Sequence, residues 1–154
     1  MTDVSFRLQY RAITNQEDNT VGIQLGKQAI DLGIVTTNGE AMLSFYRDVL
    51  GFKYLREMPM PGGNGVMHQL LCGDSMIKLV TLASTPAAAA PGGIQGATGY
   101  RYWTITVTNI TELLQFCADQ GHTVIMKERE LRPGVRIGIV SDPDGNWVEF
   151  LALG

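Results

Sequence analysis

The chain has 154 residues and a formal net charge of −3, and 45% of its residues are hydrophobic while 18% are charged. This balance is typical of a globular protein that builds its own core. The acidic net charge argues against a nucleic-acid partner, which usually needs a basic face. The absence of a basic amphipathic run and of an apolar run of about 18 residues argues against a membrane partner.

Cysteine usage and the start of the chain point to a cytoplasmic protein. Cys72 and Cys117 are the only cysteines, and they lack CxxC spacing, which suits free thiols in a reducing compartment. The opening MTDVSFRLQYR contains an early acidic residue and no apolar segment, so it does not resemble a signal peptide.

The first 27 residues predict an appended β-hairpin. Hydrophobic residues alternate with polar ones from residue 4 to residue 12 and again from residue 21 to residue 25, with a polar stretch between them. Alternation with a period of two indicates strands with one buried face. We therefore expect an N-terminal hairpin extension over residues 1–27.

The rest of the chain repeats its pattern at an offset of 71 residues, so that residue 31 falls on residue 102. Each half begins with a β-branched run, at 30–37 and at 102–108, and continues with an amphipathic helix. These helices should end at Gly51 and Gly121, because glycine readily adopts the left-handed conformation that stops a helix.

Asn38 and Asn109 stand where the two helices should begin. Their side chains could accept a hydrogen bond from a free N–H group of the first turn, so we expect both to act as caps. Residues 109–112 also have the spacing of a capping box.

Three further strands are predicted after each helix. They are expected at 53–58, 66–72, 75–82, 123–128, 136–141 and 146–153. Each half therefore has the order βαβββ, which predicts an α+β protein of two tandem modules. We place the first module at 28–82, an Ala-, Pro- and Gly-rich linker at 83–98, and the second module at 99–154.

Two motifs support a resemblance to a known family. Residues 45–52, FYRDVLGF, are similar to the first-helix motif FYxxxLGF, and residues 142–149, DPDGNWVE, are similar to the closing hairpin motif DPDGNxxE. Over residues 29–153 the chain resembles the vicinal-oxygen-chelate superfamily, which includes glyoxalase I, extradiol dioxygenases, methylmalonyl-CoA epimerase and the fosfomycin and bleomycin resistance proteins. This resemblance implies an open, cup-shaped mixed β-sheet with helices outside.

The resemblance also places four metal-ligand positions on the first and last strands of the modules. In this chain they are Asp31, Lys78, Tyr102 and Glu149. Only Glu149 is a usual ligand, and the lysine ammonium has no lone pair to donate. We therefore expect no metal and no other cofactor.

Strand parity predicts which side chains line the cup, because residues i and i+2 share a face. The expected inner set comprises Asp31, Gly33, Val35, Met76, Lys78, Val80, Tyr102, Thr104, Thr106, Trp147, Glu149 and Leu151. Their neighbours should pack beneath the helices: Leu32, Ile34, Ile77, Leu79, Trp103, Ile105, Val148 and Phe150. Hairpin register further predicts Gln69 beside Lys78, and Arg136 and Gly138 near Glu149.

The inner set favours acid–base chemistry. Glu149 or Asp31 could act as a general base, and the sequence does not rank them. Lys78 or Tyr102 could stabilise or protonate an oxyanion. The expected substrate-binding residues are Gln69, Met76, Thr104, Arg136 and Trp147. Alternatively, Lys78 could simply form an internal ion pair with Glu149 or Asp31.

Three functions follow from these features. The first is a metal-independent lyase, isomerase or hydrolase that acts on a small organic metabolite. The second is a non-catalytic small-molecule-binding protein of the drug-sequestering kind. The third is a glyoxalase-like or dioxygenase-like metalloenzyme with atypical ligands. For each of them we expect a homodimer, because the resemblance implies paired modules and the appended hairpin offers an open edge.

Overall fold

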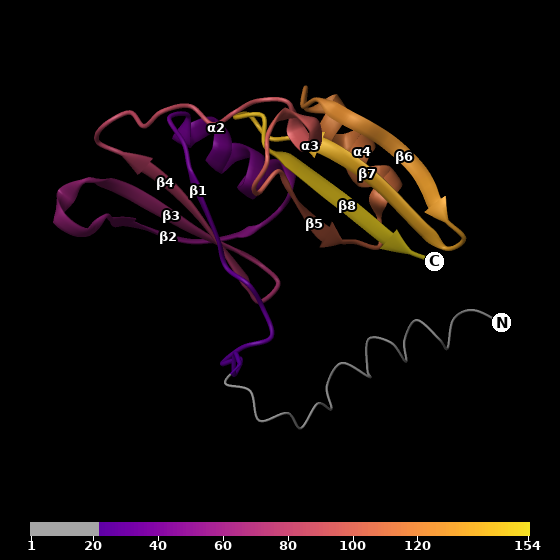
Figure 1. The fold of residues 1–154 in the computed structure, drawn as a ribbon, viewed down its shortest axis with the longest axis horizontal. Coiled ribbons are helices and arrows are strands. Elements are labelled where there is room, and N and C mark those ends of the chain that lie inside the picture. The colour runs from indigo at the N-terminus through magenta and orange to yellow at the C-terminus, as the bar shows by residue number, and fades with distance from the viewer. Residues whose placement is uncertain (1–21) are drawn as a thin grey trace.

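The computed structural model describes residues 22–154, which form two four-stranded mixed sheets (Figure 1). The first sheet has the order β1-β4-β3-β2, with β1 at Leu32–Val35, β2 at Lys53–Pro59, β3 at Gly65–Cys72 and β4 at Ser75–Leu82. The second has the order β5-β8-β7-β6, with β5 at Tyr102–Thr106, β6 at Val124–Arg132, β7 at Val135–Ser141 and β8 at Trp147–Leu153. In each sheet the strands that come first and last along the chain pair in parallel, β1 with β4 and β5 with β8. The other neighbouring strands pair antiparallel. This arrangement confirms the predicted α+β fold.

One helical segment follows the first strand of each sheet. In the first half, α2 spans Gly39–Ser44 and continues as a π-helical turn, η2, over Phe45–Val49. In the second half, α4 spans Ile110–Asp119. Gly51 and Gly121 follow these helices with φ angles of 74° and 83°, which confirms the predicted glycine stops.

The predicted side-chain caps are wrong. Neither Asn38 nor Asn109 makes a side-chain hydrogen bond to its helix, and each begins the helix through its backbone carbonyl instead. Their ψ angles of 51° and 45° lie outside the extended region in which a cap side chain normally reaches the first turn. The backbone N–H of Asn38 donates to the hydroxyl of Thr36 at 2.8 Å.

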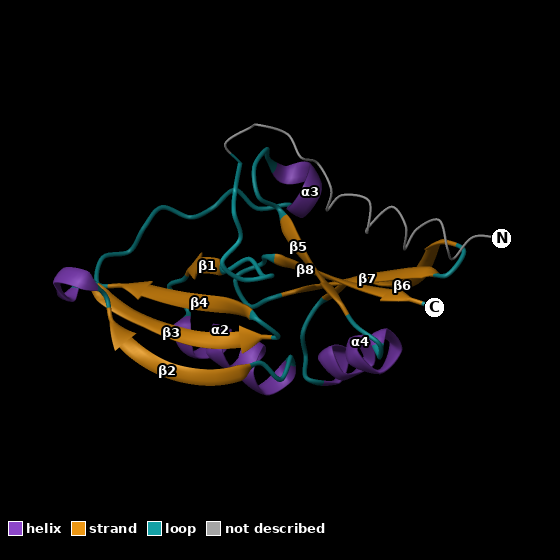
Figure 2. Cartoon of the chain, turned by 90° about the horizontal axis from the view of Figure 1, so that it is seen from below, coloured by secondary structure: helices purple, strands orange, loops and turns teal. Residues whose placement is uncertain are grey.

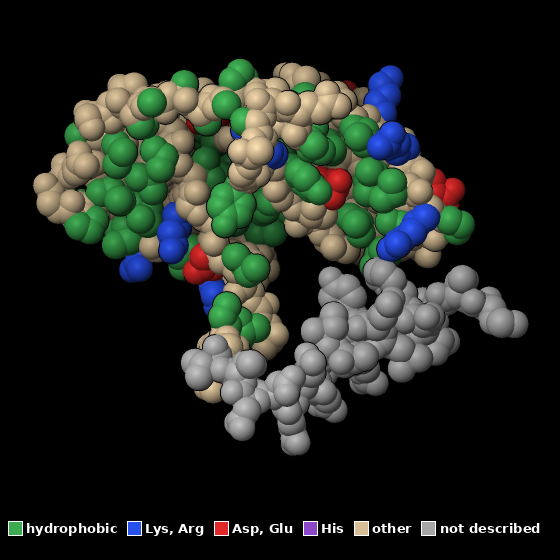
Figure 3. Space-filling model, viewed as in Figure 1, with side chains coloured by type: hydrophobic (Ala, Val, Ile, Leu, Met, Phe, Trp, Pro, Cys, Tyr) green, Lys and Arg blue, Asp and Glu red, His purple; other side chains and the backbone are tan. Residues whose placement is uncertain are grey.

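The helices and the linker lie on opposite sides of the sheets. Figure 2 shows α2 and α4 on the same side of the two sheets, while the segment that carries the short helix α3, at Gly93–Gly96, lies on the other side. We call the helix-covered side of each sheet the outer face and the opposite side the inner face. Figure 3 views the inner faces, where hydrophobic side chains are interrupted by scattered charged groups.

The core packs between the outer faces and the helices. Ile77, Leu79, Val148 and Phe150 are each at most 1% exposed, as strand parity predicts. A single hydrophobic cluster joins side chains from both halves of the chain, including Met42, Phe45, Tyr46, Leu114 and Cys117. The two sheets therefore share one core within the chain.

The N-terminal hairpin falls mainly outside the described residues. Residues 1–21 are not described, and residues 22–31 contain no strand. No helix of the described residues has the length and hydropathy needed to cross a membrane.

Candidate functional site

The parallel strand pairs position three of the four predicted catalytic side chains on the inner faces. Gly33 of β1 lies opposite Lys78 of β4, and Thr104 of β5 lies opposite Glu149 of β8. Tyr102 starts β5 two residues before Thr104 and is 47% exposed. The alternation along these strands is the one that the sequence predicts.

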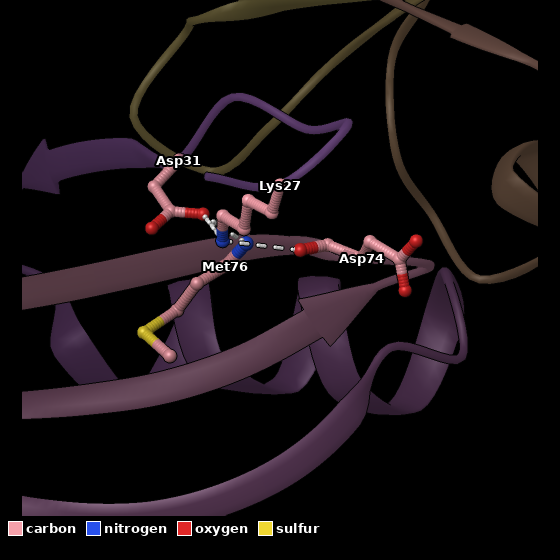
Figure 4. Close-up of polar contacts among 4 residues, drawn as sticks. All are labelled: Lys27, Asp31, Asp74 and Met76. Atoms are coloured by element: carbon pink, nitrogen blue, oxygen red, sulfur yellow. Dashed lines mark hydrogen bonds and ion pairs between the residues drawn. The ribbon is translucent and has the colours of Figure 1, made fainter. Parts of the chain in front are cut away.

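Asp31, just before β1, is already engaged by neighbouring groups (Figure 4). Its Oδ1 atom accepts a hydrogen bond from the ammonium of Lys27 at 2.5 Å and another from the backbone N–H of Met76 at 2.8 Å. Lys27 also donates to the backbone carbonyl of Asp74 at 3.2 Å. The bond from Lys27, followed by that from Met76, lowers the pKa of Asp31 below its ordinary value, which makes this carboxylate a poor proton acceptor.

Lys78 does not form the ion pair that the sequence suggests. Within the described part of the chain, no carboxylate lies within 4.0 Å of its ammonium, and Asp31 pairs with Lys27 instead. Lys78 is still close enough to contribute to the lowered pKa of Asp31. The segment before β1 supplies a nearer cation, and nothing in the repeat pattern signals this contact.

Glu149 has a different environment from Asp31. One of its carboxylate oxygens accepts a hydrogen bond from the hydroxyl of Thr104 at 2.8 Å. Its cross-strand neighbour on β7 is Ile139, which is 1% exposed. Among the described residues, Glu149 forms no ion pair. The carboxylate of Glu149 therefore has one neutral hydrogen-bond donor, Thr104, and one apolar neighbour, Ile139.

The linker covers the end of this inner face. Trp147 lies opposite Tyr102 and packs so closely on Gly93 that a Cβ atom added there would come within 2.1 Å of the indole. Arg101 holds the linker in place, since its guanidinium donates to the backbone carbonyls of Gly93, Ala90 and Pro91.

Gln69 occupies the predicted place beside Lys78, and the structure adds a residue that the sequence analysis missed. Gln69 is directly opposite Lys78 and is 7% exposed. Its Oε1 atom accepts a hydrogen bond from Nε of Arg56 at 2.9 Å. A register shift between Tyr54 and Arg56 brings this arginine opposite Gln69, and such a bulge cannot be placed from alternation alone. Met76 lies two residues before Lys78 on β4, opposite Leu71.

The predicted placement of Arg136 and Gly138 near Glu149 is wrong. Glu149 pairs with Ile139, so both of these even-numbered residues of β7 point to the outer face. Arg136 lies opposite Ala152 and forms an ion pair with Glu128, whose other oxygen accepts a bond from Thr111 of α4. A register that differs by one residue from the expected one exchanges the two faces. Arg136 therefore does not belong to the candidate site.

Comparison with known proteins assigns this architecture. A profile described as the Glyoxalase/Bleomycin resistance protein/Dioxygenase superfamily matches residues 29–150. The chain belongs to this superfamily. Among curated protein sequences, none matches the chain significantly.

Solved structures of the superfamily share the fold. A glyoxalase family protein from Enterococcus faecalis is 26% identical, with 83% of this chain and 96% of that chain covered and a TM-score of 0.61. A glyoxalase family protein from Bacillus cereus is 17% identical, with coverages of 88% and 99% and a TM-score of 0.72. Glyoxalase I from Zea mays is 17% identical, with coverages of 79% and 43% and a TM-score of 0.67.

The donor set at the superfamily's ligand positions does not fit a divalent cation. One of the four positions carries the ammonium of Lys78, which cannot donate a lone pair. The Asp31 carboxylate is paired with Lys27. No group of three or more His, Cys, Asp or Glu side chains within residues 22–154 could hold a metal ion. We therefore derive no chemistry through a metal.

A separate pocket lies between the two halves and contains none of the predicted site residues. Its volume is about 290 Å³. It is lined by Leu50, Gly51, Phe52, Leu71, Cys72, Gly73, Ile105, Val107, Asn109, Leu113 and Phe150. Burial raises the pKa of the Cys72 thiol, so the pocket offers no ready nucleophile or base.

Proposed function

We propose that the inner faces bind a small organic molecule and that Glu149 accepts a proton from it in a metal-independent reaction of the lyase or isomerase type. Superfamily membership supports small-molecule binding, and the chemistry rests on the contrast between two carboxylates. Asp31 is held by an ammonium, whereas Glu149 is held only by the hydroxyl of Thr104. This contrast ranks the two candidate bases in favour of Glu149.

The immediate neighbours of Glu149 suit such a role. Thr104 fixes one carboxylate oxygen and leaves the other without a partner among the described residues. The buried, apolar Ile139 is its cross-strand neighbour on β7 and offers no competing proton donor from its side chain. Tyr102 at the start of the neighbouring strand is a proton donor within the same sheet.

Proton exchange in heavy water tests this proposal without knowledge of the natural substrate. The full chain is incubated with a panel of small aldehydes, ketones and 2-oxo acids, and deuterium incorporation next to the carbonyl is followed by NMR. We expect exchange with at least one compound, an approximately hundredfold loss in Glu149→Gln, and retained exchange in Asp31→Asn.

Glu112→Gln provides the matched control, since Glu112 lies on α4, away from the inner faces. Equal exchange in the wild type and Glu149→Gln would remove Glu149 from the mechanism.

A second candidate function is non-catalytic binding, as in drug-sequestering proteins. The neutralisation of Asp31 by Lys27 favours it, because the first sheet then offers no base to a ligand. In this case a ligand should bind to the wild type and to Glu149→Gln with similar affinity, and no compound of the panel should exchange its protons.

We also propose a homodimer, as expected from the superfamily resemblance. Val35 and Tyr102 leave 52% and 47% of their surfaces exposed on the inner-face side of the two edge strands β1 and β5. Light scattering after size-exclusion chromatography tests the assembly, and a mass equal to one chain would contradict it.

A further inference from the structure

A row of polar side chains crosses the inner face of the first sheet. The strand registers place Gly33, Lys78, Gln69 and Arg56 side by side, from β1 through β4 and β3 to β2. Side chains that are directly opposite each other on neighbouring strands point to the same face. We call Arg56, Gln69 and Lys78 the cationic row.

The two charges of the cationic row have no anionic partner. Among residues 22–154, no carboxylate lies within 4.0 Å of Arg56 or Lys78. Asp31, which interacts electrostatically with Lys78, is paired with Lys27. Two unpaired cations on one sheet face create a local positive potential, which favours an anion.

The guanidinium of Arg56 is oriented by the row itself. Its Nε atom donates to Gln69, whose side chain is nearly fully buried, so the hydrogen bond fixes the direction of the arginine. The two terminal amino groups of Arg56 have no protein partner in the described residues. They form the edge that binds carboxylate and sulfonate groups through two parallel hydrogen bonds.

An apolar row lies directly beside the cationic row. It lies two residues along each of the same four strands, and therefore on the same face, and comprises Val35, Val80, Met67 and Met58. Gly33, at the β1 end of the cationic row, has open space where a side chain would lie, since no atom comes within 4 Å of its ideal Cβ position. A ligand group can therefore approach Lys78 from the β1 side.

We infer that the cationic row recognises the oxyanion group of a small organic anion whose hydrophobic body lies on the apolar row. This inference rests on the proposed function and specifies its substrate class. Arg56 and Lys78 bind the anionic group, and Gln69 positions Arg56. The methionines of the apolar row supply a deformable contact for the hydrophobic body.

A pair of fluorescent probes tests the inference on the full chain. Anilinonaphthalene sulfonate carries an anionic group and an aromatic body, and phenylnaphthylamine has a similar body without the charge. Fluorescence titration should show tighter binding of the sulfonate, with a preference that falls as salt is added. Arg56→Gln and Lys78→Met should each weaken sulfonate binding by about tenfold and leave phenylnaphthylamine binding unchanged.

Lys127→Met is the charge-matched control, since Lys127 is an exposed lysine of β6 in the other sheet. Arg56 is itself exposed, so Arg56→Gln should retain the wild-type melting temperature. Sulfonate affinity that is the same in the wild type and in both row variants overturns the inference. Binding of the neutral probe alone overturns the inference and leaves the proposed function intact. If neither probe binds, the proposal that the inner faces form a binding site is itself contradicted.

Discussion

Tyr46 and Asp142 are joined by a buried hydrogen bond in which the tyrosine hydroxyl donates to Oδ2 of the aspartate at 2.8 Å. Tyr46 belongs to the FYRDVLGF motif of the first half, and Asp142 begins the DPDGN turn of the second half. The same carboxylate accepts hydrogen bonds from the backbone N–H groups of Asp144 and Asn146. The two motifs by which the sequence resembles the superfamily are therefore bonded to each other, and they fix one half against the other.

Removing the tyrosine hydroxyl should destabilise the whole chain. Tyr46 is 0% exposed, so Tyr46→Phe leaves the buried carboxylate without one of its donors. We expect a loss of about 1–3 kcal/mol in the free energy of unfolding, measured by urea denaturation. Tyr100→Phe is the control, because Tyr100 is fully exposed and its change should leave the unfolding curve in place. Equal stability of Tyr46→Phe and wild type would show that the bond between the halves contributes nothing.

Asp142 should give stability a distinctive pH dependence. Burial, partly offset by hydrogen bonds from Asn146 and Tyr46, raises the pKa of Asp142 above its ordinary value of 3.8. Because the pKa is higher in the folded state, protonation of Asp142 stabilises the fold. This stabilisation is fully present below pH 3.8 and is lost as the pH rises through the pKa of the folded state. The free energy of unfolding of wild type relative to Asp142→Asn should therefore fall across this window. A difference that grows with pH would show that the hydrogen bonds outweigh burial.

Asp31 should show the opposite dependence. The bonds from Lys27 and Met76 lower its pKa, so its stabilising contribution is present above pH 3.8 and is lost as the pH falls through the folded value. In Lys27→Met we expect the pKa of Asp31 to rise toward 3.8, as measured by NMR titration of its carboxyl carbon. Lys127→Met should leave it unchanged. If Lys27→Met has no effect on the titration, the contact drawn in Figure 4 is not formed in solution.

Two glycines test the assignment of the faces. A Cβ atom at Gly138 would lie 2.4 Å from Cδ1 of Leu114 on α4, whereas one at Gly33 would meet nothing within 4 Å. Gly138→Ala should therefore cost about 1–3 kcal/mol of unfolding free energy, because the buried side chain of Leu114 must shift in a packed core. Gly33→Ala should change stability by less than about 0.5 kcal/mol. Denaturant unfolding of both variants decides the matter, and a reversed order would mean that the inner and outer faces are wrongly assigned.

The sequence predicts the elements well because they follow from local patterns. Strand alternation places Ile77 and Phe150 under the helices, and the glycines at 51 and 121 end those helices as expected. Contacts that depend on register or on irregular segments are harder to predict. A bulge in β2 places Arg56 opposite Gln69 in the site, and the register of β7 places Arg136 on the outer face.

The partner of Asp31 shows a second limit. Lys27 lies in residues 22–31, which form no strand, and its contact depends on how that segment returns to the turn at Asp74. The repeat relates positions within the two modules to each other, so it carries no information about a cation that comes from outside them. As a result, the sequence identifies the position of Asp31 but offers only Lys78 as a possible ion-pair partner, whereas the partner in the structure is Lys27.

The linker should act as a removable cover of Trp147. Gly93 has a φ of 56° and packs on the indole ring, so it meets two demands that only glycine satisfies here. In Gly93→Val the new side chain would overlap the ring, and the linker must move away from it. Since Trp103 packs against the shared core, the change in indole exposure should arise from Trp147. We expect acrylamide to quench tryptophan fluorescence more strongly in Gly93→Val than in wild type.

Arg101→Met should produce the same change by another route, because it removes the hydrogen bonds that hold the linker to the sheet. Gly26→Ala is the control, since Gly26 has open space around its Cβ position. Both linker variants should keep the wild-type unfolding transition, because α3 lies on the inner-face side and outside the shared core (Figure 2). Unchanged quenching in both variants would mean that Trp147 is equally accessible with and without the linker, and the linker would then have no role in controlling access to the site.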